Sequence, residues 1–221
     1  MSNAHSEETW QARFQQLGLS EMQRVAGLRA PLPLKAQRFW FLRHGETEGN
    51  ATRIIQHAEI SLNARGFEQA QVAAQVLRHQ PIARIYGSTM TRAWQTAQAV
   101  GRACGKEPIP EDGLRERWFG DLVGTTSVGL NWSIDPPNGD RIADFVNRTC
   151  DTALRLLADD TPTLLVAHGG NLYALAFALG IELEVAYIAN ATPLLIERSD
   201  GRWHIHPLTA PAQGGPVLPP S

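Results

Sequence analysis

Apolar and polar positions follow one another along the chain in blocks typical of strands alternating with helices. Short apolar runs bounded by turn residues predict strands, and apolar positions three or four residues apart predict amphipathic helices. The expected strands cover residues 38–43, 83–88, 163–167, 193–198 and 202–207. The expected helices cover residues 64–79, 90–104, 140–159 and 171–180. Glycine and proline punctuate residues 105–139, which predicts a mostly irregular segment there.

The ends and buried faces of these elements can be predicted in more detail. Asn63 is expected to cap the helix of 64–79, whose apolar stripe is Phe67, Ala70, Ala74 and Leu77. The helix of 140–159 is expected to start at Asp140 and to bury Ile142, Phe145, Val146, Ala153 and Leu157. Gly180 is expected to end the last helix, and the turn at Asp200-Gly201 predicts a hairpin of the last two strands.

The order of the elements predicts the fold class. The wholly apolar run 163–167 is typical of a strand covered on both faces in a parallel sheet. Strands that alternate with helices, without an internal repeat, predict an α/β fold: a three-layer α/β/α sandwich around a mostly parallel central sheet. Residues 34–208 form the expected domain, and the proline- and glycine-rich residues 209–221 predict a disordered tail.

Residues 1–33 are expected to form a helical extension that precedes this domain. Helical spacing over residues 6–30 is interrupted by Gly18, which favours two short helices. The candidate contact residues are Trp10, Phe14, Leu17, Met22 and Val25. The extension can cover its own domain, shape a pocket or bury into a partner subunit of a homodimer, and the sequence leaves these alternatives open.

The composition and net charge of the chain bear on which partners it can bind and in which compartment it works. A net charge of −2 and a pI near 6.4 give no basic excess for binding a nucleic acid or an anionic membrane. The polar, acidic N-terminus is not typical of a signal peptide, and no apolar run approaches the ~20 residues that span a bilayer. Cys104 and Cys150 fall on the apolar sides of expected helices, which predicts buried free thiols and a reducing, cytoplasmic setting.

Cationic side chains gather at the junctions where expected strands end. Arg43-His44 and His168 directly follow strands, and Arg92 lies in the first turn of a helix that follows another strand. Each residue alone has a structural explanation, but the carboxyl ends of parallel strands meet in one crevice. Cations that converge there would repel one another without a ligand, so the pattern predicts a dianion such as a phosphoryl group. Helix N-termini would add donors for it.

Taken together, these stretches resemble the histidine phosphatase superfamily, which includes cofactor-dependent phosphoglycerate mutases. The resemblance spans residues 38 to 198 and keeps the family's order. It is carried by Arg43-His44-Gly45 with Thr47 and Asn50, Asn63-Ala64-Arg65-Gly66, Ser88 with Arg92, Leu114-Arg115-Glu116 with Phe119-Gly120, and His168-Gly169-Gly170. The ordered set is specific, whereas an isolated Arg-His-Gly would be weak evidence.

The resemblance implies a covalent mechanism with a phosphohistidine intermediate. His44 would be the nucleophile, and for this its ring must be neutral. Arg43 and Arg92 would clamp the phosphoryl oxygens, because a planar guanidinium matches the tetrahedral anion. Glu116 would protonate the leaving group and then activate the water that hydrolyses the intermediate. A surface salt bridge with a neighbouring arginine is the structural alternative for Glu116.

The resemblance also implies supporting donors around the phosphoryl group. His168, in its protonated form, would stabilise the charge on the equatorial oxygens, and Thr47 and Asn50 would add neutral donors. Neither a metal nor another cofactor is implied, because the two arginines and the histidine supply the positive charge that a metal ion supplies elsewhere.

Departures from the family pattern bear on the substrate. Asp121-Leu122-Val123-Gly124 replaces the usual Trp and Glu after Phe-Gly, Tyr173 occupies a position that often holds arginine, and Met90 replaces a leucine. These losses of charge argue against a strongly anionic substrate such as phosphoglycerate. Only 52 positions separate Glu116 from His168, so the lid is short, and a short lid that admits water favours a phosphatase over a mutase.

The aromatic residues of the lid have two interpretations. Trp118 and Trp132, together with Phe119 and Tyr173, either line the substrate mouth or pack the lid to the body. The expected substrate is a phosphorylated small molecule, with a phosphoprotein as the alternative. The competing functions are phosphoglycerate mutase-type phosphoryl transfer and a non-catalytic module that binds a phosphorylated ligand.

Overall fold

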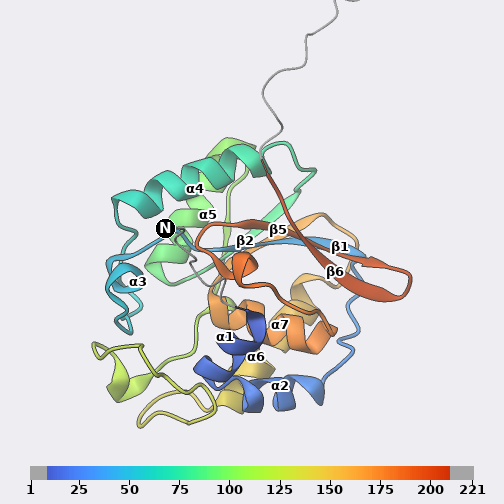
Figure 1. The fold of residues 1–221 in the computed structure, drawn as a ribbon. Coiled ribbons are helices and arrows are strands. Elements are labelled where there is room, and N and C mark those ends of the chain that lie inside the picture. The colour runs from blue at the N-terminus through green and yellow to red at the C-terminus, as the bar shows by residue number, and fades with distance from the viewer. Residues whose placement is uncertain (1–8, 210–221) are drawn as a thin grey trace, which may run out of the picture.

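The computed structural model describes residues 9–209, which form a six-stranded sheet with helices on both faces (Figure 1). The strands are β1 (Arg38–Arg43), β2 (Arg84–Ser88), β3 (Ile109–Glu111), β4 (Thr163–Ala167), β5 (Pro193–Ser199) and β6 (Arg202–Pro207). Their order is β3-β2-β4-β1-β5-β6, in which β3, β2, β4 and β1 are parallel. Strands β5 and β6 run antiparallel and form the expected hairpin. The predicted α/β class and mostly parallel sheet are confirmed.

Helices cover the sheet in two layers. They are α1 (Trp10–Leu17), α2 (Ser20–Gly27), α3 (Glu48–Thr52), α4 (Ala64–Leu77), α5 (Thr91–Cys104), α6 (Ile142–Leu156) and α7 (Gly169–Leu179), with 3₁₀ turns η1 (Asp112–Leu114), η2 (Gly120–Leu122) and η3 (Val185–Ile188). Figure 1 shows α4 and α5 on one side of the sheet and α1, α2, α6 and α7 on the other. The two apolar cores lie between these layers and the sheet.

Strand β1 contributes side chains to both apolar cores. Successive side chains of a strand point to opposite faces. Phe39 and Phe41 therefore pack into the core that includes α6 and α7, whereas Trp40 and Leu42 pack into the core of α4 and α5. All four side chains are buried, which makes β1 a rigid base for the residues that follow it.

Several sequence predictions were wrong in detail. Phe67, which was expected in the buried stripe of α4, is 43% exposed. The neighbouring Gly66 packs so closely against the backbone of Glu46 that an added Cβ would lie 2.0 Å from its carbonyl oxygen. The Gly66 face of α4 is therefore the one turned inward. Helix α6 begins at Ile142 rather than Asp140, and α7 begins at Gly169. The short strand β3 and helix α3 were missed, because three to five residues carry too little periodicity. Cys150 is buried as expected, but Cys104 is only half-buried near the end of α5.

The N-terminal extension packs into the same core as the domain. Gly18 adopts a left-handed φ of 60° and separates α1 from α2, as predicted. Leu19, Met22 and Ala26 are fully buried, and α2 packs against α6 and α7. Residues 1–8 of the extension and residues 210–221 of the predicted tail lie outside the described residues.

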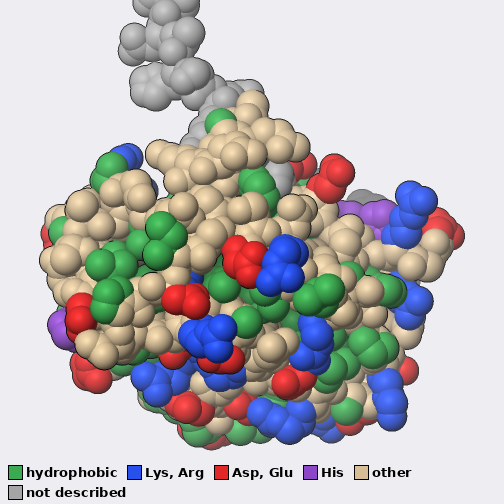
Figure 2. All heavy atoms as spheres, turned by 90° about the horizontal axis from the view of Figure 1, so that it is seen from below, with side chains coloured by type: hydrophobic (Ala, Val, Ile, Leu, Met, Phe, Trp, Pro, Cys, Tyr) green, Lys and Arg blue, Asp and Glu red, His purple; other side chains and the backbone are tan. Residues whose placement is uncertain are grey.

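The surface carries charges of both signs. On the face that lies at the bottom of Figure 1, Lys and Arg side chains are interspersed with Asp and Glu side chains (Figure 2). Within residues 9–209, every helix is too short or too polar to cross a membrane.

Candidate active site

The two predicted catalytic histidines lie side by side at one edge of the sheet. Strands β1 and β4 are parallel neighbours, and His44 and His168 each follow the last residue of one strand. The His44 amide donates to the carbonyl oxygen of Ala167 over 3.0 Å, which extends the pairing of the strands by one residue. The two imidazole rings lie edge to face with centroids 5.1 Å apart. The convergence expected from the topology of a parallel sheet is therefore present.

His44 is held in one tautomer. Its Nδ1 lies 2.7 Å from the carbonyl oxygen of Gly45, and a carbonyl can only accept, so Nδ1 carries the proton. The lone pair consequently resides on Nε2, which accepts from Nε of Arg92 over 3.3 Å. Burial lowers the pKa of His44 well below 6.5, and the charges of Arg92 and Arg43 add to this effect. The ring is therefore neutral, as a nucleophile requires.

The two predicted arginines flank this nitrogen. Arg92 is buried, and its guanidinium also donates to the carbonyl oxygen of His57 over 3.0 Å. Burial lowers the pKa of Arg92 to about 10, which leaves it charged at neutral pH. Arg43 donates through Nη1 to the carbonyl oxygen of Ile188, while its buried Nε has no hydrogen-bond partner among the described residues. That Nε–H is a donor available to an anion.

His168 is positioned by a residue whose role the sequence left unassigned. The Ser88 hydroxyl lies 2.9 Å from Nε2 of His168 and accepts from the Met90 amide over 3.3 Å. The hydroxyl can donate to Nε2 or accept from it, and when it donates, the ring proton lies on Nδ1. Nδ1 is buried and has no partner within residues 9–209, so in that tautomer it is a second donor available to an anion.

The surroundings of His168 bear on its protonation state. Burial lowers the pKa of His168 well below 6.5, and the charges of Arg92 and Arg43 add to the effect. The lowered pKa favours the neutral form of His168 while no anion is bound. A neutral ring can still donate one hydrogen bond from Nδ1, and a nearby dianion would raise its pKa.

Glu116 is held between two amides beside this cluster. Its Oε1 accepts from the amide of Arg117 and its Oε2 from the amide of Gly170, each over 3.1 Å. Burial raises the pKa of Glu116, while the two amides and the charges of Arg92 and Arg43 oppose the rise. The salt-bridge alternative does not apply, because the carboxylate bonds to backbone amides rather than to an arginine side chain. A carboxyl with a raised pKa beside a nucleophile is suited to proton transfer.

Thr47 and Asn50 differ in their access to the cavity that contains His44. Thr47 is fully buried and caps α3: its hydroxyl accepts from the Asn50 amide over 3.1 Å. Asn50 lines the cavity that contains His44, and its Oδ1 accepts from the Thr47 amide and from Nδ2 of Asn190. Asn190, which sequence reasoning missed, also donates to the His44 carbonyl over 3.0 Å. Thr47 therefore orients Asn50 rather than facing the cavity itself.

The mouth residues divide between two cavities. Trp132 and Tyr173 line the cavity of about 490 Å³ that contains His44, Arg43, Arg92 and Glu116. Both side chains are buried, and Trp132 packs edge-on against Phe119 and Tyr173. Trp118 lies in a neighbouring cavity of about 450 Å³, which also borders Glu116. Trp132 thus both packs the lid and lines the cavity, which combines the two sequence-based interpretations.

The cavity gains charge that sequence reasoning did not anticipate. Arg13 of α1 and Arg53, which follows α3, line it together with the predicted residues. The expectation that the mouth has lost its positive charge is therefore wrong. No local sequence signal marks Arg13, because only the tertiary packing of the N-terminal helices brings α1 to the cavity.

Metal ligands do not gather in the described part of the chain. Residues 9–209 contain no group of three or more His, Cys, Asp or Glu residues that could hold a metal ion. The arrangement instead offers a neutral imidazole lone pair, guanidinium and imidazole donors around it, and one adjacent carboxyl group.

Known proteins share this arrangement of sequence and fold. The chain is 35% identical over 149 residues, 58% of its length, to phosphoglycerate mutase-like protein 4 of Arabidopsis thaliana, and it spans 65% of that relative. It is 32% identical to glucosyl-3-phosphoglycerate phosphatase of Mycolicibacterium vanbaalenii over 169 residues, covering 66% of this chain and 75% of the relative. The native structure of a mycobacterial glucosyl-3-phosphoglycerate phosphatase matches with a TM-score of 0.66 and 28% identity, covering 80% of this chain and all of that one.

The family match extends over most of the domain. The sequence profile of the histidine phosphatase superfamily (branch 1) matches residues 39–210. This range begins inside β1 and contains His44, Arg92, Glu116 and His168, whereas α1 and α2 precede it. The chain belongs to the histidine phosphatase superfamily.

Proposed function

We propose that this protein is a metal-independent phosphomonoesterase that acts through a phosphohistidine on His44. The observation that carries the proposal is the tautomer of His44. Its Nδ1 proton is held by the Gly45 carbonyl, so the Nε2 lone pair faces Arg92, one of the donors that would surround a phosphoryl group. The substrate is a phosphorylated small molecule.

The first step transfers the phosphoryl group to the enzyme. The lone pair of His44 Nε2 forms a bond to phosphorus while the bond from phosphorus to the leaving oxygen breaks. Arg43 and Arg92 bind the phosphoryl oxygens, and the Nδ1 proton of His168 adds a third donor. The leaving oxygen takes its proton from the Glu116 carboxyl, whose raised pKa keeps a protonated fraction available.

The second step releases inorganic phosphate. A water molecule attacks phosphorus, its proton passes to the Glu116 carboxylate, and the electrons of the phosphorus–nitrogen bond return to Nε2. Glu116 regains the proton that it gave up in the first step, so one carboxyl serves both half-reactions.

Hydrolysis is favoured over mutase activity by the short lid. Residues 121–139 supply the lid, and several of them, including Leu130 and Trp132, reach the cavity. A short lid admits water to the phosphoenzyme, whereas a mutase must exclude it. The glucosyl-3-phosphoglycerate phosphatases among the relatives are named for hydrolysis, which supports the same choice.

Phosphate release and trapping of the intermediate test the proposal. The purified protein, with a chelator present, is expected to release inorganic phosphate from a panel of phosphomonoesters. Rapid quench should trap a phosphoenzyme that is stable in alkali and labile in acid, as phosphoramidates are. His44→Ala should lose both signals and keep its fold. Turnover that needs a phosphorylated primer and releases no phosphate would indicate a mutase, and tight binding without turnover would indicate a binding module.

The cellular setting belongs to the same proposal. Cys104 and Cys150 are free thiols, which supports a reducing, cytoplasmic location. A homodimer stays a prediction, which sedimentation velocity of the purified chain would test.

A further inference from the structure

The N-terminal helices form part of the wall of the active-site cavity. Phe14 of α1 packs edge-on against Phe177 of α7, with ring centroids 6.0 Å apart. Arg13, Gln16 and Leu17 of α1 line the cavity that contains His44. Arg13 and Leu17 are four residues apart, so they share one face of the helix. That face is turned toward the site.

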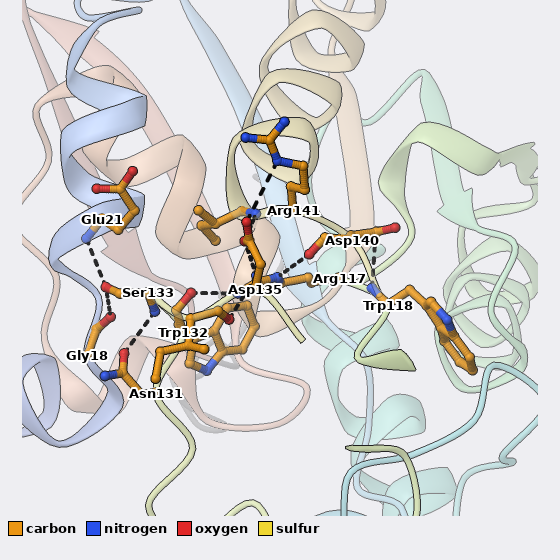
Figure 3. A network of polar contacts seen from close by, with 12 residues as sticks. Gly18, Glu21, Arg117, Trp118, Asn131, Trp132, Ser133, Asp135, Asp140 and Arg141 are labelled. Carbon is orange, nitrogen blue, oxygen red and sulfur yellow. Dashed lines mark hydrogen bonds and ion pairs between the residues drawn. The ribbon is translucent and has the colours of Figure 1, made fainter. Parts of the chain in front are cut away.

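Hydrogen bonds join this helix to the lid. The Trp132 amide donates to the Leu17 carbonyl over 2.9 Å, and the Ser133 hydroxyl donates to the Gly18 carbonyl over 2.6 Å. The Glu21 amide in turn donates to the Ser133 hydroxyl over 3.1 Å. Figure 3 shows Ser133 between Gly18 and Glu21, with dashed lines for its hydrogen bonds to both. The connection fixes α1, and with it Arg13, relative to the rim of the cavity.

Arg13 lines the cavity beside Tyr173. Among the influences on the Tyr173 hydroxyl are the charge of Arg13 and a side-chain hydrogen bond with it. Tyr173 is one helical turn beyond Gly170, whose amide bonds to Glu116. The charge of Glu116 also acts on the Tyr173 hydroxyl, so Arg13 and the proposed proton donor to the leaving oxygen neighbour the same tyrosine.

The cavity is lined by more positive charges than one phosphoryl group needs for binding. Glu116 is the only acidic residue among the described residues of the lining, against the guanidinium groups of Arg13, Arg43, Arg53, Arg92 and Arg117. The Arg117 side chain is engaged by Asp135 and by carbonyls of the lid, and Arg43 and Arg92 serve the phosphoryl group. Burial lowers the pKa of Arg43, and the charge of Arg13 adds to this, so the two cations repel. A second anion would relieve that repulsion.

We propose that Arg13 binds a second anionic group, a carboxylate or a phosphate, on the leaving part of the substrate. The N-terminal helix would then select phosphomonoesters with an anionic leaving group. A planar guanidinium suits both anions, because two of its N–H groups can pair with two oxygens. Arg53, which follows α3, lines the same cavity and would add to the attraction. This inference rests on the proposed phosphatase function for its substrate class.

Matched substrates test the inference. O-phosphoserine and phosphoethanolamine differ by one carboxylate, and glucose 1,6-bisphosphate and glucose 6-phosphate differ by one phosphate. The wild-type protein should prefer the anionic member of a pair in kcat/KM, and the preferred pair identifies the anion. Arg13→Gln should lower that preference about tenfold, mainly through KM, since one charge-assisted hydrogen bond is lost. Arg13→Lys should retain part of it.

Controls separate this inference from a general effect of charge or folding. Arg24→Gln removes the same charge from α2, where Arg24 is exposed and paired with Glu21, and should keep the wild-type preference. A preference that survives Arg13→Gln and Arg13→Lys unchanged would overturn the inference. Calorimetric titration of the same ligands into His44→Ala, with and without Arg13→Gln, tests it without turnover. Failure of wild-type protein to release phosphate from any ester would overturn the proposed function instead, while titration still decides the role of Arg13.

Discussion

The amide nitrogen of Gly170 lies 3.1 Å from Oε2 of Glu116, and this arrangement leaves no room for a side chain at position 170. A Cβ at position 170 would lie 2.2 Å from Oε1 of Glu116 and 2.8 Å from the ring of Trp132. The second glycine of His168-Gly169-Gly170 is therefore required by the close approach of the proposed acid. This contact joins the start of α7 to the segment that carries Glu116.

Gly170→Ala is expected to displace Glu116 and to reduce kcat about a hundredfold, the scale of a 1 Å misplacement. The loss should be larger for an alkyl phosphate than for p-nitrophenyl phosphate, whose leaving group needs little protonation. Gly169→Ala is the matched control, because its added Cβ meets nothing closer than 3.8 Å. Equal losses on both substrates would show that Gly170 does not act through Glu116.

Ser88→Ala is expected to lower kcat about tenfold while the fold is kept. The hydroxyl that forms a hydrogen bond with Nε2 of His168 would be gone, and a neutral hydrogen bond contributes roughly 0.5–1.5 kcal/mol. Steady-state kinetics with one phosphomonoester measures the effect. Thr89→Ala removes an exposed hydroxyl from the next residue and should leave kcat near the wild-type value. A Ser88→Ala variant with wild-type kcat would contradict the positioning role.

The pH profile of kcat/KM should reach its maximum at acidic pH. Reaction requires neutral His44, whose pKa is lowered below 6.5 by burial, and protonated Glu116, whose pKa is raised above 4.5 by burial. Activity therefore extends below pH 6.5 and declines as pH rises through the pKa of Glu116. Glu116→Gln should abolish the alkaline decline in the activity that remains. The second ionisation of the substrate, near pH 6, is common to both proteins and cancels in their ratio.

Stability should decrease as pH falls below about 6.5. The pKa values of His44 and His168 are both lowered in the folded state, so the unfolded chain binds more protons between those values and 6.5. The raised pKa of Glu116 has the opposite sign: its contribution is present at low pH and is lost as pH rises through that pKa. Thermal unfolding of His168→Asn should show a weaker decrease between pH 7 and 5 than the wild type. An identical decrease in both proteins would show that His168 does not contribute to the loss of stability at acidic pH.

Arg117→Met is expected to loosen the lid. The guanidinium of Arg117 donates to the carbonyls of Trp132, Ile134 and Asp140 and pairs with Asp135 (Figure 3), and its side chain is fully buried. Limited proteolysis should cut residues 121–139 faster than in the wild type. Arg141→Met is the control, because Arg141 reaches the same Asp135 over 3.7 Å from an exposed position. Equal cleavage of both variants would show that the buried contacts of Arg117 do not hold the lid.

The sequence by itself determined the features that depend on local spacing. An apolar run that ends at Arg43-His44 and another that ends at His168 were enough to place both histidines at the ends of parallel strands. Strand alternation and the order of the elements then predicted the α/β sandwich, because parallel strands need helical crossovers. Phe67 marks the limit of this reasoning, since the helical period does not fix how far α4 is rotated about its own axis.

Tertiary structure alone decided what depends on neighbours distant in the chain. Protonation equilibria belong to this class: burial and the charges of Arg92 and Arg43 lower the pKa of His168, and no residue beside it in sequence indicates this. The positions of Trp118 and Trp132 were also decided by the tertiary structure, since η2 and the lid place these residues in different cavities. Arg13 is the clearest case. Its place at the active site follows from the packing of α1 on α7 and from hydrogen bonds to the lid, contacts between segments more than 100 residues apart.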